Sequence, residues 1–358
     1  MHDTRVRVAL LTPPGRGALA VVGVAGAGAL EIVTRLFHPR GAAIADRPDG
    51  AIAFGRWADP ERGEELVVVR RTPESLEVHC HGGIAASEAV IRSLEAAGAV
   101  RQPWPEWLAA SGVSEIEVEA REALAQASGP KAARILARQL AGQLGRELDR
   151  IRALRATGRQ AEADAAVARL VRASRVGLRL TRPWRVVLAG PVNAGKSSLV
   201  NALAGHARSI VSAEPGTTRD VLETRIVLDG WEVDLIDTAG LREADLADAS
   251  PTERAGIERA IAATAEADLV LRLGGAGFQP ASADNPRDIA VASKCDLAPT
   301  GVVPPPGAIR TSTVTGEGIA ELAAAIVQRL VPEEHEDPTL LAGPVPFTVG
   351  QALACRHL

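Results

Sequence analysis

The chain has 358 residues, enough for two or three domains with separate cores, and its 46% hydrophobic and 23% charged residues exclude extended disorder and collagen-like repeats. No apolar run approaches the roughly 18 residues of a bilayer-spanning helix, and the three cysteines are widely spaced, so we expect a cytoplasmic protein with neither a signal peptide nor a membrane anchor. The net charge is −4, but residues 131–185 carry 14 Lys/Arg against 4 Asp/Glu, which suggests a polyanionic partner or a solvated helical face.

The first hundred residues alternate short β-like runs with a helical stretch. Apolar and β-branched residues dominate residues 6–11, 19–24, 66–71 and 76–80, and this composition favours strands. Residues 85–97 have helical spacing instead. We therefore expect a compact α+β domain over residues 1–112.

Apolar residues in the middle of the chain recur at helical spacing. The residues that share one face, three or four positions apart, are Leu136, Leu140, Leu144, Leu148, Ile151 and Leu154. An average spacing close to 3.6 predicts one long amphipathic helix here, and a second helix is expected over residues 161–176. These segments indicate an α-helical domain over residues 113–184.

A third domain is indicated from residue 184 onward. The apolar run at 184–190 enters a glycine-rich turn, and strand-like runs then alternate with helix-like stretches to about residue 330. This alternation favours an α/β domain with a mostly parallel sheet over residues 185–331. Residues 331–346 are rich in proline and acidic residues, and residues 332–358 are expected to form a short segment that returns to the helical domain.

Residues 190–197, Gly-Pro-Val-Asn-Ala-Gly-Lys-Ser, match the phosphate-loop pattern between a strand and a helix. In such a loop the backbone amides and the helix N-terminus bind phosphates, the lysine reaches the β- and γ-phosphates, and the next hydroxyl ligates Mg²⁺. Lys196 and Ser197 are the candidates for the last two roles. The expected phosphate-binding residues are Asn193, Ala194, Gly195, Lys196, Ser197 and Ser198.

Two further segments complete a predicted Mg²⁺ and γ-phosphate site. The strand-like run 233–236 ends in Asp237, whose carboxylate is expected beside Mg²⁺, and the amide of Gly240 is expected near the γ-phosphate. Thr217 and Thr218 lie in a loop suited to a switch, in which a hydroxyl reaches Mg²⁺ only when a γ-phosphate is present. We assign Thr218 to that ligand and Thr217 to the nucleotide.

Residues 293–296, Ser-Lys-Cys-Asp, stand where GTPases carry an Asn-Lys-x-Asp guanine-binding motif. Asp296 can accept two hydrogen bonds from the guanine edge, a pattern that adenine does not offer, so GTP and GDP are the expected ligands. Ser293 replaces the usual asparagine and shortens or removes one base contact, which predicts guanine selectivity with weaker affinity. Lys294 belongs to the same site, and Ser312 begins the loop expected behind the base.

Together these residues resemble the MnmE (TrmE) family of tRNA modification GTPases. Residues 193–205 are similar to that family's phosphate loop and following helix almost residue for residue, and 237–243 and 256–259 are similar to its later motifs. At the N-terminus, Thr-Pro-Pro-Gly-Arg-Gly (12–17) and His-Gly-Gly (81–83) are typical of its first domain. The resemblance implies a GTPase that acts in wobble-uridine modification of tRNA, together with the flavoprotein MnmG.

The resemblance also implies that K⁺ supports the pairing of two G domains. Asn193 would ligate K⁺, and oxygens of the loop 212–217 would complete the site; the loop ligands are Ser212, Glu214 and Thr217. The cation then takes the place of an arginine finger.

The group that orients the attacking water must also differ from that of Ras-like enzymes. Leu241 follows Gly240 where those enzymes carry a glutamine. Glu253 matches the water-orienting glutamate of the MnmE family, so Glu253 and Lys196 are the expected catalytic residues.

The family's first domain forms a homodimer and binds a tetrahydrofolate derivative, for which Arg16 is the candidate residue here. Two segments depart from the family pattern. Residues 101–108 read Arg-Gln-Pro-Trp-Pro-Glu-Trp-Leu where a Pro-Gly-Glu-Phe motif is typical, and residues 355–358 do not form the family's Cys-x-Gly-Lys motif.

These departures leave two alternatives open. The chain could be a GTP-dependent switch or ribosome-assembly protein that modifies no base. It could also be a degenerate paralogue that keeps the fold and binds nucleotide weakly.

Overall fold

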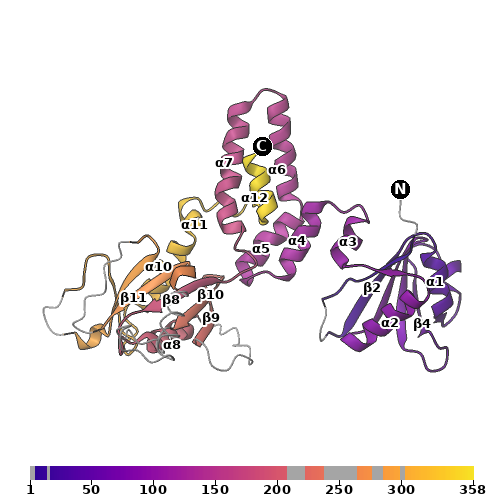
Figure 1. Ribbon diagram of the computed structural model, residues 1–358, viewed down its shortest axis with the longest axis horizontal. Coiled ribbons are helices and arrows are strands. Elements are labelled where there is room, and N and C mark those ends of the chain that lie inside the picture. Colours follow the sequence, from indigo (N-terminus) through magenta and orange to yellow (C-terminus); the bar gives the residue numbers. More distant parts are fainter. Residues whose placement is uncertain (1–4, 14–16, 208–221, 238–263, 276–284, 299–302) are drawn as a thin grey trace, which may run out of the picture. The chain divides into compact units, whose positions relative to one another are not determined.

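The computed structural model describes residues 5–13, 17–207, 222–237, 264–275, 285–298 and 303–358 (Figure 1). Its contacts divide the chain into two compact units, Met1–Ala125 and Gln126–Leu358. Within the described ranges no helix is long and apolar enough to cross a membrane.

The first unit is built on a mixed sheet, whose described strands run in the order β3-β4-β5-β6-β2-β1-β7. Their bounds are β1 Arg7–Leu10, β2 Leu19–Ala25, β3 Phe37–Pro39, β4 Ile52–Trp57, β5 Glu65–Thr72, β6 Ser75–His81 and β7 Val100–Arg101. Neighbouring strands pair antiparallel, except that β1 and β7 are parallel. Every second residue of β6 is buried, as expected for a sheet with one face in the core.

Helices cover both faces of this sheet. The helices are α1 Ala29–Leu36, α2 Ile84–Ala96, α3 Trp104–Ala109 and α4 Glu115–Ala125. Apolar residues of α1 and α2, including Val33 and Leu94, join the strands in one core. Trp107 of α3 packs on Ala9 and Ala25, which alternate with the core-facing residues of β1 and β2 and therefore lie on the opposite face. The expected α+β fold is confirmed.

The helical part of the second unit contains α5 Gly129–Leu140, α6 Gln143–Ala156, α7 Gln160–Gly177 and α12 Val349–Arg356. Helices α6 and α7 lie side by side, and α12 packs against α7 (Figure 1). Segments that are far apart in the sequence thus share this bundle.

The prediction of one long helix through residues 136–154 is wrong. Helix α5 ends at Leu140 and α6 begins at Gln143, because Gly142 has a φ of +86°, which a residue without a Cβ adopts readily. Its amide bonds to the carbonyl of Gln139 at 2.8 Å and closes α5. The leucine spacing continues across this break because both helices place leucines in the interior: Leu136 of α5 and Leu144 of α6 are both fully buried.

The segment before α12 is held against α5 and α7. The buried Gln139 amide donates to the carbonyl of Gly343 at 3.3 Å, and its side-chain oxygen accepts from the amide of Val345 at 3.2 Å. A Cβ at Gly177 would lie 1.9 Å from the carbonyl oxygen of Pro346, so the backbones approach each other too closely for any other residue. A capping box of Thr348 and Gln351 then begins α12.

The remaining part of the second unit is an α/β fold. Its described strands run in the order β13-β12-β11-β8-β10-β9, with only β9 antiparallel to its neighbour. The strands are β8 Trp184–Ala189, β9 Leu222–Leu228, β10 Trp231–Asp237, β11 Leu269–Gly274, β12 Asp288–Ser293 and β13 Ile309–Thr311, and the helices are α8 Lys196–Ala207, α10 Ile319–Leu330 and α11 Pro332–Glu336. This confirms the expected mostly parallel sheet. Since parallel strands end at the same edge, the segments that follow β8, β10 and β12 meet there.

Candidate functional site

The loop between β8 and α8 has the geometry of a phosphate cradle. Three of its residues have positive φ: Gly190 at 150°, Asn193 at 62° and Gly195 at 91°. A Cβ at Gly190 would lie 2.4 Å from the carbonyl oxygen of Leu273, so only glycine fits there. Successive turns of this kind direct backbone amides into the loop, next to the N-terminus of α8, where anions are stabilised.

The predicted lysine and magnesium residues converge on this loop. Lys196 is buried, and its Nζ donates to the carbonyls of Gly190 at 2.5 Å and Pro191 at 3.0 Å. The Ser197 hydroxyl donates to Oδ2 of Asp237 at 2.5 Å, across forty residues of sequence. Ser197 and Asp237 therefore present adjoining oxygen donors, the ligand type that Mg²⁺ prefers.

Ser293 lies at the end of β12 and contacts the phosphate loop. Its buried hydroxyl is 2.6 Å from the carbonyl oxygen of Ala194 and 2.7 Å from that of Gly274. Sequence reasoning placed Ser293 at the base and missed Gly274, which carries no local signal because it contributes only a backbone oxygen.

Lys294 lies next to the same loop, and Asp296 follows it two residues later. Lys294 has a left-handed φ of 57°, and a Cβ at Gly195 would lie 3.6 Å from its Cε, so the lysine stem passes over the phosphate loop. Asp296 is exposed in a short 3-10 helix, Cys295–Leu297, and its carboxylate bonds to none of the described residues. Cys295 lies between Lys294 and Asp296 in the sequence. Its thiol has a raised pKa, mainly because it is partly buried and to a smaller extent because Glu317 is close. Asp296 is thus placed to receive hydrogen bonds from a ligand.

Ser312 shapes the next loop from within. Its fully buried hydroxyl accepts from the amides of Val314 at 3.2 Å and Thr315 at 3.1 Å. Its own amide donates to the carbonyl of Glu317 at 3.0 Å. The Ser312 side chain therefore stabilises the loop conformation.

Several predicted site residues lie outside the described ranges. These are Arg16, Ser212, Glu214, Thr217, Thr218, Gly240 and Glu253. The described residues of the phosphate loop and the start of α8 are Asn193, Ala194, Gly195, Lys196, Ser197 and Ser198. Asp237, Ser293 and Lys294 approach them, and Asp296 lies two residues beyond Lys294.

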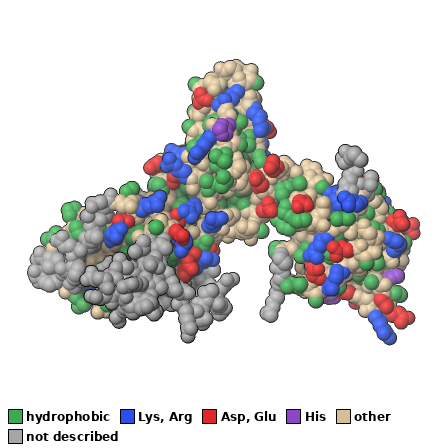
Figure 2. Space-filling model, in the orientation of Figure 1, with side chains coloured by type: hydrophobic (Ala, Val, Ile, Leu, Met, Phe, Trp, Pro, Cys, Tyr) green, Lys and Arg blue, Asp and Glu red, His purple; other side chains and the backbone are tan. Residues whose placement is uncertain are grey.

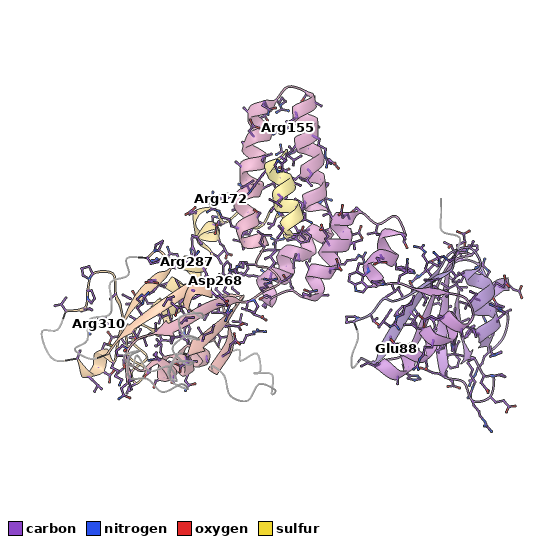
Figure 3. The ribbon with its side chains drawn as sticks, in the orientation of Figure 1. Glu88, Arg155, Arg172, Asp268, Arg287 and Arg310 are labelled. Atoms are coloured by element: carbon purple, nitrogen blue, oxygen red, sulfur yellow. The ribbon has the colours of Figure 1, made fainter. Side chains whose placement is uncertain are left out.

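A second candidate site lies in the first unit. The amide of Gly82 bonds to the carbonyl of Ala18 at 3.0 Å, and a Cβ at Gly82 would lie 1.8 Å from the Gly17 oxygen, so the two N-terminal motifs meet. Beside them is a pocket of about 310 Å³ whose lining includes Leu19, Ile84 and Ser87. Glu88, labelled in Figure 3, also lines this pocket and forms an ion pair with Arg101 at 2.5 Å.

Most of the positive charge of residues 131–185 is neutralised by acidic side chains. Arg169 pairs with Asp337 at 2.8 Å, and Arg172, labelled on α7 in Figure 3, pairs with Glu336 at 3.0 Å. Acidic and basic side chains are interspersed on the visible face of the helical part (Figure 2). The arginines without an acidic partner among the described residues are Arg134, Arg138, Arg146, Arg175 and Arg182. This pairing favours a solvated, ion-paired face over a continuous basic patch.

Comparisons with known proteins match both parts of the chain. A family described as "GTP-binding protein TrmE N-terminus" matches residues 7–105, and one described as "50S ribosome-binding GTPase" matches residues 185–287. The tRNA modification GTPase MnmE of a Thermus thermophilus strain is 35% identical over 372 aligned residues, which cover 91% of this chain and 83% of that protein. The protein of the same name from a Synechococcus species is 32% identical over 411 residues, covering 100% and 86%.

Proposed function

This chain belongs to the MnmE family of tRNA modification GTPases, and from that membership we propose that it couples GTP hydrolysis to modification of the wobble uridine of tRNA. It is a GTP-binding and GTP-hydrolysing enzyme. The structural observation that supports the hydrolytic part of the proposal is the pair formed by Ser197 and Asp237, which joins the phosphate loop to the end of β10.

In the proposed mechanism, different described residues stabilise charge, hold the phosphates and select the base. In the proposed complex, Lys196 leaves the loop carbonyls and bonds to phosphate oxygens, where its charge stabilises negative charge that develops during phosphoryl transfer. The loop amides hold the same phosphates in position. Asp296 accepts from the guanine edge and selects the base.

Ser197, Asp237 and Thr218 are the proposed Mg²⁺ ligands. The hydroxyl and carboxylate oxygens at Ser197 and Asp237 are 2.5 Å apart and fit a small cation that takes oxygen ligands. When bound, Mg²⁺ neutralises charge on the β- and γ-phosphates.

Potassium and Glu253 complete the proposed mechanism. Asn193 is exposed on the loop with a φ of 62°, so its side chain can contribute to a K⁺ site together with oxygens of the segment 212–217. Glu253 is proposed to orient the attacking water, since Leu241 has no group for that role. Two G domains pair in this mechanism, so the rate per molecule depends on protein concentration over the range in which the homodimer dissociates.

The N-terminal pocket is the proposed site of a tetrahydrofolate derivative, with Arg16 nearby in sequence. Its apolar wall, formed in part by Leu19 and Ile84, and the hydroxyl of Ser87 suit a planar ring with polar edges. The proposed protein is a cytoplasmic homodimer whose partners are tRNA and an MnmG-like flavoprotein.

Restoration of wobble modification tests this function. The gene is expressed in bacteria that lack their own MnmE, and the tRNA nucleosides are measured by mass spectrometry. We expect the modified wobble nucleoside to reappear with the natural chain but not with Lys196→Ala. GTP turnover without modification would instead favour a GTP-dependent switch or assembly protein, and loss of both would favour a degenerate paralogue.

A further inference from the structure

The Ser293 hydroxyl contacts the backbone of two neighbouring segments. It lies within hydrogen-bonding distance of two carbonyl oxygens, Ala194 on the phosphate loop and Gly274 at the end of β11. The residue is only 6% exposed, so water does not compete freely for these contacts. The serine therefore bridges the phosphate loop and the sheet.

The Ser293 hydroxyl has no second proton with which to donate a hydrogen bond to the base. A serine side chain carries one proton and otherwise only acceptor lone pairs. That proton is already shared between the two carbonyl oxygens. The N7 and O6 atoms of guanine are also acceptors, so Ser293 has no donor left for them.

We propose that Ser293 is a positioning residue, which fixes the phosphate loop to β11 through Ala194, and that it does not contact the base. Guanine is then selected at its N1–H and N2–H₂ groups by Asp296, whose exposed carboxylate bonds to no other described residue. This inference rests on the proposed use of GTP. It predicts that the protein is indifferent to the purine N7 atom.

Competition binding with purine nucleotide analogues tests the inference. Dissociation constants for GTP, 7-deaza-GTP and XTP are measured against a fluorescent GDP on the full chain. We expect 7-deaza-GTP, which lacks N7, to bind within about twofold of GTP. XTP has a carbonyl in place of the 2-amino group and should bind at least about tenfold more weakly, because one hydrogen bond to Asp296 becomes a repulsion.

Two variants separate positioning from base contact. Ser293→Ala should weaken GTP and 7-deaza-GTP by the same factor, roughly tenfold, and slow single-turnover hydrolysis at saturating GTP. Asp296→Asn should reverse the preference between GTP and XTP. Ser174→Ala is the matched control, because Ser174 is a buried serine in α7 that also bonds to a carbonyl, at 2.8 Å, and it should change no nucleotide affinity.

Two results would overturn the inference while GTP binding stands. One is a preference of about tenfold or more for GTP over 7-deaza-GTP that Ser293→Ala removes, since Ser293 would then contact N7. The other is a Ser293→Ala protein with unchanged affinity and turnover. If the natural chain unfolds cooperatively yet binds no guanine nucleotide, the proposed function fails and this inference fails with it.

Discussion

At the scale of single residues, the Ser197 hydroxyl and the Asp237 carboxylate form the contact on which the proposed chemistry depends. Each residue is placed by its own element: Ser197 by the first turn of α8, and Asp237 by the last position of β10, which pairs with Leu188 of β8. Their 2.5 Å contact brings together two oxygen ligands for Mg²⁺.

Ser197→Ala should reduce GTP turnover by at least about tenfold and raise the Mg²⁺ concentration needed for half-maximal rate, because one metal ligand is lost. The measurement is a Mg²⁺ titration of the GTP hydrolysis rate. Asn201→Ala, an exposed position one turn further along α8, is the control and should leave the titration unchanged. An unchanged Mg²⁺ requirement in Ser197→Ala would remove Ser197 from the metal site.

At the scale of elements, α7 approaches the segment before α12, called the return segment here, so closely that only glycine fits at position 177. Gly177→Ala should lower the free energy of unfolding by about 1–3 kcal/mol, because its Cβ would lie 1.9 Å from the Pro346 oxygen and force the two backbones apart. Urea denaturation followed by circular dichroism measures the effect.

Gly145→Ala provides a matched control in α6. A Cβ at Gly145 meets nothing within 4 Å, so the same substitution should stabilise by about 0.5–1 kcal/mol through helix propensity. Equal effects at the two positions would contradict the observed packing of the return segment.

The sequence predicts some of these features and not others. Apolar runs in the sequence predict the strands before and after the phosphate loop. The loop itself is predicted by the spacing of glycine, lysine and serine in residues 190–197, which is specific to phosphate-binding loops. By contrast, the break at Gly142 is masked by leucine spacing that continues through it, and the partners of Gln139 and Gly177 lie on a segment far along the chain. Likewise, nothing near Ser293 in sequence indicates its contacts with Ala194 and Gly274.

At the scale of the second unit, Lys131 connects three segments that are distant in sequence. Its Nζ donates to Asp229 at 2.8 Å, in the β9–β10 turn, and to Glu334 of α11 at 2.9 Å. Trp231 donates to the same Glu334 at 3.0 Å, and the Lys131 ammonium lies 5.9 Å from its ring centre. Burial opposes the charge on Lys131, but the hydrogen bonds to Asp229 and Glu334 outweigh it and raise the pKa of the lysine.

Lys131→Met should therefore lower the stability of the second unit by about 2 kcal/mol near neutral pH. A lysine whose pKa is raised on folding stabilises the fold fully below its ordinary value of 10.5, and the contribution is lost as pH rises through the higher, folded value. The stability difference between the two proteins should thus persist at neutral pH and shrink in strongly alkaline buffer.

Arg134→Met on the same helix is the control, since Arg134 is exposed and has no acidic partner among the described residues. Urea denaturation at neutral and alkaline pH compares the variants. A Lys131→Met protein as stable as Arg134→Met at neutral pH would show that the contacts of Lys131 with Asp229 and Glu334 contribute no stability.

The most direct test of the central claim is the rate of GTP hydrolysis by the purified chain in KCl and in NaCl over a range of protein concentrations. We predict faster turnover in K⁺, with a rate per molecule that rises with concentration as the homodimer assembles, because the proposed K⁺ site at Asn193 acts when two G domains pair. Equal rates in the two salts, independent of concentration, would contradict an MnmE-type mechanism for this GTPase.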